Sequence, residues 1–326
     1  MNATQLLERM SGMRVLVVGD ICLDRWCTYN PAHSIPSRET GIPRTAVIEA
    51  ESTPGAAGTV AVNLKSLGVR EVAVMGAIGD DGFAFELCRA LSRKSISTEY
   101  LVVSELLNTF TYTKLLNSQT GKEDLPRLDF INSGDLPENV EAKICEMIDA
   151  ASRFDLICVS DQAETERGGV VTAVVRDKLA ELASASGPLV WVDSRRRIEH
   201  FRNAALKVNA DEAAEARARS GVPNLGDVRK QANASSLFVT HGGSGVQIFD
   251  ERGETWIMTR RIAHPVDICG AGDSFTAGAA CALAAGSTPE EAARLGHLVA
   301  SVSIMKRGTG FALPDEVIEA ERWANE

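Results

Sequence analysis

Short apolar runs alternate with longer amphipathic segments along most of the 326-residue chain. The apolar runs are largely continuous, as in parallel strands with both faces buried, and lie at residues 14–18, 72–77, 156–159, 189–193, 205–208 and 237–240. Helical patterns follow or separate them at residues 58–67, 81–92, 169–185 and 289–305. This order predicts an α/β fold with a doubly wound, mostly parallel sheet flanked by helices.

Two segments interrupt the alternation. Residues 28–52 are rich in proline and serine, and residues 106–130 alternate polar and apolar side chains in places, with a turn signal near Gly121. Both predict strands of a small exposed sheet, although ordinary surface hairpins would give the same pattern. The chain contains no internal repeat, so we expect a single domain over residues 1–326 with these two insertions.

The amino-acid composition and net charge limit the kinds of molecule that the protein is expected to bind. The chain is 44% hydrophobic and 24% charged, as is typical of soluble globular proteins. A net charge of −10 argues against nucleic acid as a partner, because phosphate backbones select basic surfaces. An anionic substrate would therefore need a local cluster of arginine, lysine or backbone N–H groups.

The sequence also predicts a cytoplasmic protein with no membrane partner. No signal-peptide pattern precedes the apolar run at residues 15–18, and the stretch of small residues at 277–285 is too short to span a bilayer. The seven cysteines include no Cys-x-x-Cys pair, which is typical of thiols in a reducing compartment.

The chain's most informative motif is a glycine-rich turn, Gly270-Ala271-Gly272, which places Asp273 in the first turn of an alanine-rich helical run. Uncovered backbone N–H groups and the partial positive charge of a helix N-terminus suit a phosphate. An acid in the same turn can take a proton from a hydroxyl that attacks this phosphate. An acidic N-cap after a glycine-rich loop is the simpler alternative.

The residues around this turn resemble the C-terminal signature of the ribokinase-like (PfkB) carbohydrate kinases. Asp267 precedes the turn, Ser274 and Phe275 follow Asp273, and Gly278 comes next. Residues 54–64 resemble the family's glycine-rich N-terminal signature, and weaker matches between the two extend the resemblance over nearly the whole chain.

The resemblance implies an enzyme that transfers the γ-phosphoryl group of ATP to a sugar hydroxyl. Asp273 would be the base, and the backbone of Gly270, Ala271 and Gly272 would form the anion hole. ATP and Mg²⁺ would be the cofactors, and a need for K⁺ stays open. The two insertions would form a β lid over the sugar and, as often in this family, the interface of a homodimer.

The sugar would lie between the lid and the N-terminal signature. The resemblance implies that Asp24 binds sugar hydroxyls, with Asp20 as second choice, although a turn aspartate can also cap loop N–H groups. Gly55, Ala56 and Thr59 would line the same site. Relatives commonly read Gly-Gly-Ala-Ala-Asn here, so Ala56 replaces the second glycine and Thr59 replaces the asparagine.

The nucleotide would lie on the other side of Asp273. Asn209 and Glu212 resemble the family's Asn-x-x-Glu motif, in which Glu212 would hold Mg²⁺ through water, although Glu212 is also an ordinary acid for a first helical turn. A glycine-rich loop that would border the ATP contributes Thr240, Gly242, Gly243 and Gly245. No Gly-x-x-x-x-Gly-Lys-Ser/Thr motif occurs, which excludes a P-loop kinase.

Basic residues gather in the predicted lid and nearby loops, and favour a phosphorylated sugar as substrate: Arg38, Arg44, Lys114, Arg127 and the triplet Arg195 to Arg197. Lys114 and Arg127 are the strongest candidates, and Asp161 and Asp193, at strand ends, are further acids that could face the site.

Within the family, the chain most resembles the kinases of D-glycero-D-manno-heptose 7-phosphate. Their bifunctional forms carry a His-x-Gly-His motif that this chain lacks, so we expect the kinase alone. A kinase of an unphosphorylated sugar of the ribose or fructose type, or of a nucleoside, is the alternative within the class. A non-catalytic sugar-binding regulatory protein is the alternative outside it.

Overall fold

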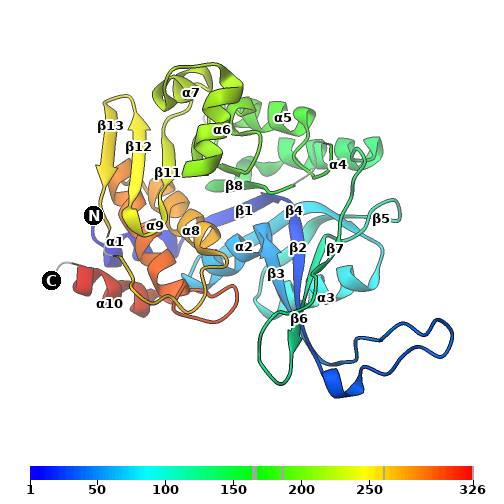
Figure 1. The fold of residues 1–326 in the computed structure, drawn as a ribbon. Helices are drawn as coiled ribbons and strands as arrows, with labels where there is room; N and C mark the ends of the chain where they lie inside the picture. The colour runs from blue at the N-terminus through cyan, green and yellow to red at the C-terminus, as the bar shows by residue number, and fades with distance from the viewer. Residues whose placement is uncertain (164–166, 185–186, 260, 325–326) are drawn as a thin grey trace.

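The computed structural model describes residues 1–163, 167–184, 187–259 and 261–324, and its main feature is a nine-stranded sheet in the order β13-β12-β11-β10-β9-β8-β1-β4-β5 (Figure 1). The strands are β1 (Arg14–Gly19), β4 (Glu71–Gly79), β5 (Ser97–Ser104), β8 (Leu156–Asp161), β9 (Leu189–Ser194), β10 (Ala205–Asn209), β11 (Leu237–Thr240), β12 (Val246–Asp250) and β13 (Gly253–Ile257). From β11 to β5 every pairing is parallel, whereas β12 and β13 are antiparallel at one edge. The predicted doubly wound α/β fold is confirmed.

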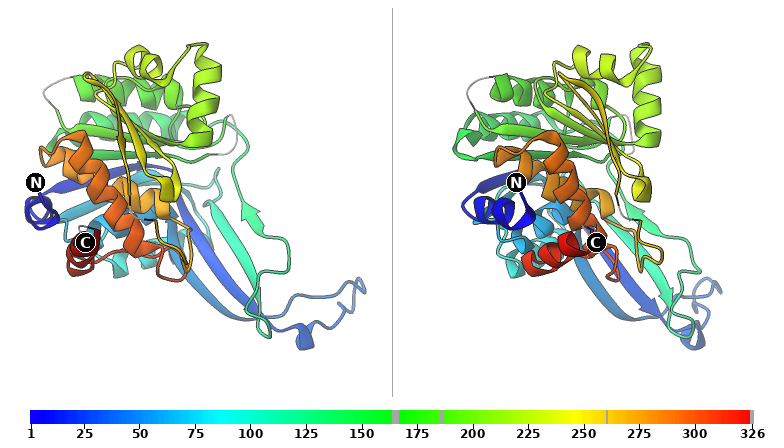
Figure 2. Two further views of the ribbon diagram at one scale, coloured as in Figure 1. Left: turned by 60° about the vertical axis from the view of Figure 1, so that its left-hand side comes forward. Right: turned by 90° about the vertical axis from the view of Figure 1, so that its left-hand side faces the viewer.

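Helices cover both faces of this main sheet because successive strand residues point to opposite sides. In β1, Val15 and Val17 pack on one side and Leu16 and Val18 on the other. The first side carries α1 (Ala3–Met10), α2 (Ala57–Ser66), α3 (Gly82–Arg93), α8 (Ala271–Ala284), α9 (Pro289–Ser303) and α10 (Pro314–Ala324). The second side carries α4 (Glu138–Asp149), α5 (Ala173–Ser184), α6 (Ala210–Ser220) and α7 (Leu225–Gln231) (Figure 2).

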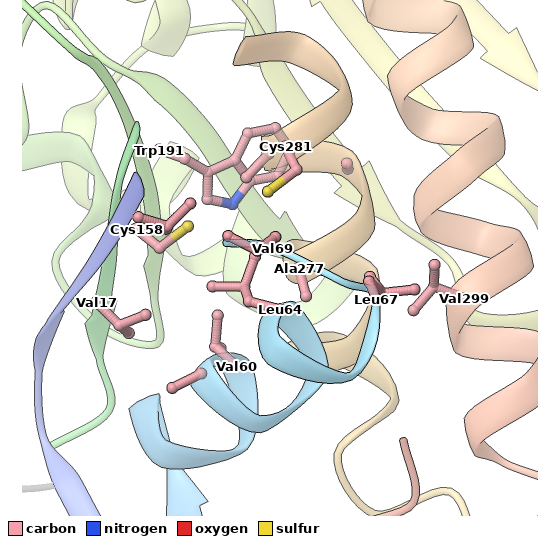
Figure 3. Close-up of a cluster of buried hydrophobic side chains, with 14 of the residues drawn as sticks. Val17, Val60, Leu64, Leu67, Val69, Cys158, Trp191, Ala277, Cys281 and Val299 are labelled. Atoms are coloured by element: carbon pink, nitrogen blue, oxygen red, sulfur yellow. The ribbon is translucent and has the colours of Figure 1, made fainter. Parts of the chain in front are cut away.

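The core beneath α2 and α8 is tightly packed. Figure 3 shows Val60 and Leu64 of α2 and Cys281 of α8 facing Trp191 of β9 and Cys158 of β8. Small residues on α8 let that helix lie close to α9, since a Cβ at Gly278 would come within 2.8 Å of the Val299 side chain. The N-terminus of α8 is thereby fixed against the carboxyl ends of the strands.

A second, smaller sheet extends from the main body in the order β3-β2-β6-β7, with a loop at residues 30–46 projecting beyond it (Figures 1 and 2). This small sheet is formed by β2 (Ile21–Tyr29), β3 (Val47–Ala56), β6 (Thr111–Asn117) and β7 (Leu128–Phe130). Both predicted insertions contribute strands to it. However, β2 begins at Ile21, directly after β1, so Asp24 lies in a strand rather than in a turn.

None of the helices in the described ranges is both long and apolar enough to cross a membrane.

Candidate functional site

The glycine-rich turn holds the start of α8 at the edge where the strands end. Gly270, the N-cap of α8, has a φ of +78°, which glycine adopts without strain. The Asp267 carboxylate fixes the preceding loop, because it accepts hydrogen bonds from the backbone N–H of Cys269 (2.9 Å) and of Gly308 (3.1 Å). Asp273 therefore stands in the first helical turn, as predicted.

Asp273 opens into a cavity of about 170 Å³ between α8 and the small sheet, which we call the central pocket. Of the residues predicted for substrate or catalysis, it brings together Asp24, Ala56, Thr59, Lys114, Arg127, Gly270 and Asp273. Arg195, the first of the predicted basic triplet, also lines it, whereas sequence reasoning had not assigned to it Tyr112, Gln162, Cys269 and Thr309. These residues come from five separate segments, which only the folded chain brings together.

The surroundings of Asp273 favour a carboxyl group that titrates near neutral pH. Burial raises the pKa of Asp273 to about 7, and the negative charges of Asp193 and Asp24 act in the same direction. The positive charges of Lys207 and Arg195 oppose this rise. Such a pKa suits a general base near neutral pH.

A buried ion pair lies behind the glycine-rich turn. Lys207 of β10 donates a hydrogen bond of 2.8 Å to Asp193 of β9, which also accepts one of 3.2 Å from Thr276 of α8. Burial alone would lower the pKa of Lys207, but the Asp193 carboxylate holds it above its usual value. A Cβ at Gly272 would lie 3.1 Å from the Lys207 ammonium nitrogen, so the glycine leaves room for this cation beside the turn. The lysine inside the apolar run at 205–208 indicates a buried cation, although the sequence does not identify its partner.

Asp24 is held on the facing strand, β2, opposite Thr53 of β3, and its carboxylate lies against Gly55 of the same strand. A Cβ at Gly55 would come within 2.7 Å of the Asp24 carboxylate, so only glycine admits this side chain. Burial raises the pKa of Asp24 to about 6, while the positive charges of Lys114 and Arg127 lower it.

The two departures from the family signature also line the central pocket. Ala56, the N-cap of α2, has a φ of +49° and a ψ of −121°, a conformation that disfavours any residue with a Cβ. Thr59 uses its hydroxyl to donate to the Pro54 carbonyl at 3.2 Å.

The predicted basic residues divide into two groups. Lys114 and Arg127 line the central pocket, whereas Arg38 and Arg44 lie on the exposed 30–46 loop and do not. Arg195 lines the central pocket and also the neighbouring cavity.

Two predicted acids have structural partners instead. Asp161 is buried and accepts hydrogen bonds from Ser194 (2.6 Å) and from the Arg197 guanidinium, and it is not among the lining residues of the central pocket. Asp20 accepts hydrogen bonds of 2.9 Å from the backbone N–H groups of Gln162, Ala163 and Val170. The loop-capping role considered for Asp24 therefore belongs to Asp20.

On the far side of Arg195, two open cavities of about 430 and 520 Å³ share Asn209 and Asp211, and we call them the outer groove. Asn209 and Glu212 form a reciprocal capping box at the start of α6, and burial raises the pKa of Glu212. Thr240 and Gly242 line the groove with His241 and Trp256. Gly243 and Gly245 lie in the same loop without lining it, and Gly245 has a φ of +123°.

In the described part of the chain, no group of three or more His, Cys, Asp or Glu side chains could hold a metal ion. Mg²⁺ usually keeps several waters and binds through one or two carboxylates together with substrate phosphates. The sparse oxygen donors here, with Glu212 beside the outer groove, fit that mode of binding rather than a protein cage.

Comparisons with known proteins identify the family that the chain matches over most of its length. The model of the pfkB family carbohydrate kinases matches residues 14–316. The bifunctional protein HldE of Caulobacter sp. (strain K31) is 33% identical over 96% of this chain, and the chain spans 64% of the length of that relative.

Solved structures show the same fold at low identity. Phosphofructokinase-2 of Escherichia coli in complex with potassium has a TM-score of 0.73 at 18% identity and covers 96% of this chain and 100% of its own. Ribokinase of Arabidopsis thaliana complexed with ribose and ATP has a TM-score of 0.69 at 15% identity, covering 95% and 99%. With a family model that matches almost its full length, the chain belongs to the pfkB family of carbohydrate kinases, phosphotransferases whose acceptor is an alcohol group.

Proposed function

We propose that this chain transfers the γ-phosphoryl group of ATP to a hydroxyl of a sugar, and that the sugar is phosphorylated. The observation that carries the proposal is the position of Asp273. Its carboxyl group, with a pKa of about 7, opens into the same pocket as Asp24 and lies at the glycine-rich start of α8. An acceptor hydroxyl and an anionic phosphoryl group can therefore meet beside one base.

In this proposal Asp24 binds hydroxyls of the sugar and Asp273 accepts the proton of the attacking hydroxyl. A bond forms between that oxygen and the γ-phosphorus, the bond to the β-phosphate oxygen breaks, and ADP leaves with the electron pair. The backbone N–H groups at residues 270–273 and the Lys207 ammonium stabilise the negative charge of the transferred group. Closure of the small sheet over the pocket excludes water, which limits hydrolysis of ATP.

The outer groove is the proposed site of the nucleotide. Thr240 and Gly242 border the ATP, Gly243 and Gly245 shape the loop that carries Gly242, and Asn209 shapes the start of α6 beside it. Glu212 holds the metal through water. Bound Mg²⁺ would supply charge neutralisation between the phosphate oxygens.

The substrate side favours an anionic sugar. Lys114 and Arg127 line the central pocket from the small sheet, and Arg195 lines it from the end of β9, in a chain whose net charge is −10. Cations kept in a pocket of an acidic protein are suited to a phosphate. Because HldE relatives match along nearly the whole chain, we propose D-glycero-D-manno-heptose 7-phosphate, phosphorylated at C1, as the substrate.

The test is an ATP-dependent phosphorylation screen of sugars, sugar phosphates and nucleosides, run with Mg²⁺ and with or without K⁺. Turnover of heptose 7-phosphate well above that of the other compounds would support the proposal. Preference for plain ribose, fructose or a nucleoside would replace the substrate, and no turnover of any acceptor would favour a non-catalytic sugar-binding protein.

Single substitutions then test which of the basic residues bind the phosphate of the substrate. Lys114→Ala removes a charge-assisted contact of about 1.5–3 kcal/mol, so kcat/KM for the phosphorylated sugar should fall tenfold to a hundredfold. Arg38→Ala and Arg44→Ala are matched controls, since these residues do not line the central pocket, and should change kcat/KM little. Equal activity of all three variants would contradict a phosphate site at Lys114.

We also propose that the chain forms a homodimer through the small sheet. Strand β3 is an edge strand whose first five residues are exposed, and Val47 and Ile48 are apolar members of that stretch. The 30–46 loop projects from the same end and exposes Ile35 and Ile42. An open apolar edge of this kind is usually paired or covered.

A further inference from the structure

Two aromatic side chains on the small sheet lie beside the two cations, Lys114 and Arg127, that this sheet contributes to the central pocket. In the parallel pairing of β2 with β6, Trp26 lies opposite Lys114 and Asp24 lies opposite Tyr112. Because alternate residues of a strand share a face, all four side chains lie on the face that carries the pocket. The Lys114 ammonium nitrogen lies 4.2 Å from the centre of the Trp26 ring, and the Arg127 guanidinium carbon lies 5.0 Å from that of Tyr112.

The two cations differ in how their charge is balanced. Arg127 forms a bidentate pair with Asp129, with distances of 2.7 and 2.6 Å, so much of its charge is already matched. For Lys114, the part of the chain that the structure describes offers no carboxylate within ion-pair distance. The Trp26 ring is therefore the neighbour that fixes the ammonium group, through attraction between a cation and an aromatic face.

Trp26 also lies close to the loop after α9, at Gly308. A Cβ at Gly308 would lie 3.8 Å from the Trp26 ring, and the Gly308 N–H donates to Asp267, which precedes the anion hole. The next residue, Thr309, lines the central pocket. Trp26 thus lies between the Lys114 cation and the loop that supports the start of α8.

Lysine has a long, flexible side chain, and ordering it when a ligand binds lowers affinity. An aromatic ring that holds the ammonium group in advance avoids part of this loss. We infer that Trp26 is a positioning residue, which holds the Lys114 ammonium in the central pocket for an anionic group of the substrate. This inference rests on the proposed function, since it takes the ligand of the central pocket to be anionic.

Kinetics of Trp26→Leu and Trp26→Phe provide the first test, with the phosphorylated sugar that turns over fastest in the screen. Trp26→Leu should raise KM for this sugar about tenfold, with kcat within about twofold and KM for ATP unchanged. Trp26→Phe keeps an aromatic face and should restore most of the affinity. Trp323→Leu, which replaces an exposed tryptophan on α10, is the matched control.

A double-substitution cycle separates positioning of Lys114 from general support of the fold. In a Lys114→Met background, Trp26→Leu should raise KM little further, because the cation that Trp26 holds is already gone. Full additivity of the two effects, or a fall in kcat with a matching rise in KM for ATP, would overturn the inference.

A spectroscopic test does not depend on turnover. In lysine-labelled protein, the Lys114 methylene protons over the indole ring should show an upfield NMR shift, assigned by its loss in Lys114→Met. Trp26→Leu should abolish this shift, and inorganic phosphate should perturb it in the wild type. A Lys114 signal unchanged by Trp26→Leu would contradict the inference. If no sugar phosphate is turned over but the NMR pairing is present, the proposed function fails while the contact between Trp26 and Lys114 stands.

Discussion

The Lys207 ammonium nitrogen lies 2.8 Å from Oδ2 of Asp193, and this buried pair joins neighbouring strands directly behind the turn that carries Asp273. The two members of this pair shift the pKa of the Asp273 carboxyl group in opposite directions. Asp193 raises the pKa of Asp273 and Lys207 lowers it, on top of the rise that burial causes. Asp273 is thereby left with a pKa of about 7, and the cation stays beside Gly272, where a phosphoryl group would sit.

Asp273→Asn should remove the base and retain the binding site. The amide keeps the size of the side chain but accepts no proton from the hydroxyl, so kcat should fall about 100-fold or more while ATP still binds. Steady-state kinetics and calorimetric titration with ATP would check this. Turnover near that of the wild type would show that another group takes the proton.

Thermal unfolding of Asp273→Asn would show that the variant is folded and would also test the raised pKa of Asp273. Burial raises the pKa of Asp273 from an ordinary 3.8 to about 7, so the protonated carboxyl favours the folded state and this stability is lost as pH rises through 7. Asparagine does not ionise, so the variant does not lose folding stability in this way as pH rises. The thermal midpoint of Asp273→Asn should therefore exceed that of the wild type by a margin that grows from pH 4 to 7 and then levels off.

Activity should depend on pH through Asp273. Because the base works only when deprotonated, kcat/KM should fall about tenfold per pH unit below about 7 and level off above it. Asp193→Asn removes a negative charge that raises the pKa of Asp273, so the acid limb should move to lower pH. A limb that stays in place, or moves upward, would contradict the assignment of the base.

The parallel strands and the glycine-rich turn at the start of α8 could be predicted from the sequence, because each depends on residues that are neighbours in the chain. A short, β-branched apolar run such as residues 14–18 is typical of a buried strand, and the turn from Gly270 to Asp273 is a local motif. The pairing of Asp193 with Lys207 was not accessible, since it depends on which strands become neighbours.

Local sequence patterns did not predict every feature of the fold and the site. Asp24 was considered as a turn aspartate, but only one residue separates β1 from β2, so Asp24 lies within a strand and Asp20 caps the loop instead. Trp26 could not be linked to the pocket because its partner, Lys114, is distant in sequence.

Ala56 stores backbone strain that glycine would relieve. Its φ of +49° is costly for a residue with a Cβ, so Ala56→Gly should raise the free energy of unfolding by about 1 kcal/mol, measured by urea denaturation. Ala214→Gly, on the exposed face of α6, is the control and should lower it by about 1 kcal/mol. Equal losses in both variants would mean that Ala56 is unstrained.

The proposed dimer can be tested with two valines of nearly equal exposure. Val47, at the start of β3, is 47% exposed, and Val174, on α5, is 49% exposed. Light scattering of the wild type should give about twice the 34.9 kDa chain mass. A charge buried without a partner in an apolar interface is unfavourable, so Val47→Glu should shift the protein toward the monomer, whereas Val174→Glu should not.

Tyr112 is unsuitable for this test, although the small sheet carries it, because it lines the central pocket and its replacement would alter the site directly. Ile48→Glu, at 56% exposure, is the second interface variant instead. If the dimer also steadies the small sheet over the pocket, both glutamate variants at β3 should lose activity together with assembly, and activity should recover as protein concentration rises. A wild-type protein that is monomeric at micromolar concentration and fully active would rule the interface out. In that case the small sheet would cover the central pocket without any contact between two copies of β3.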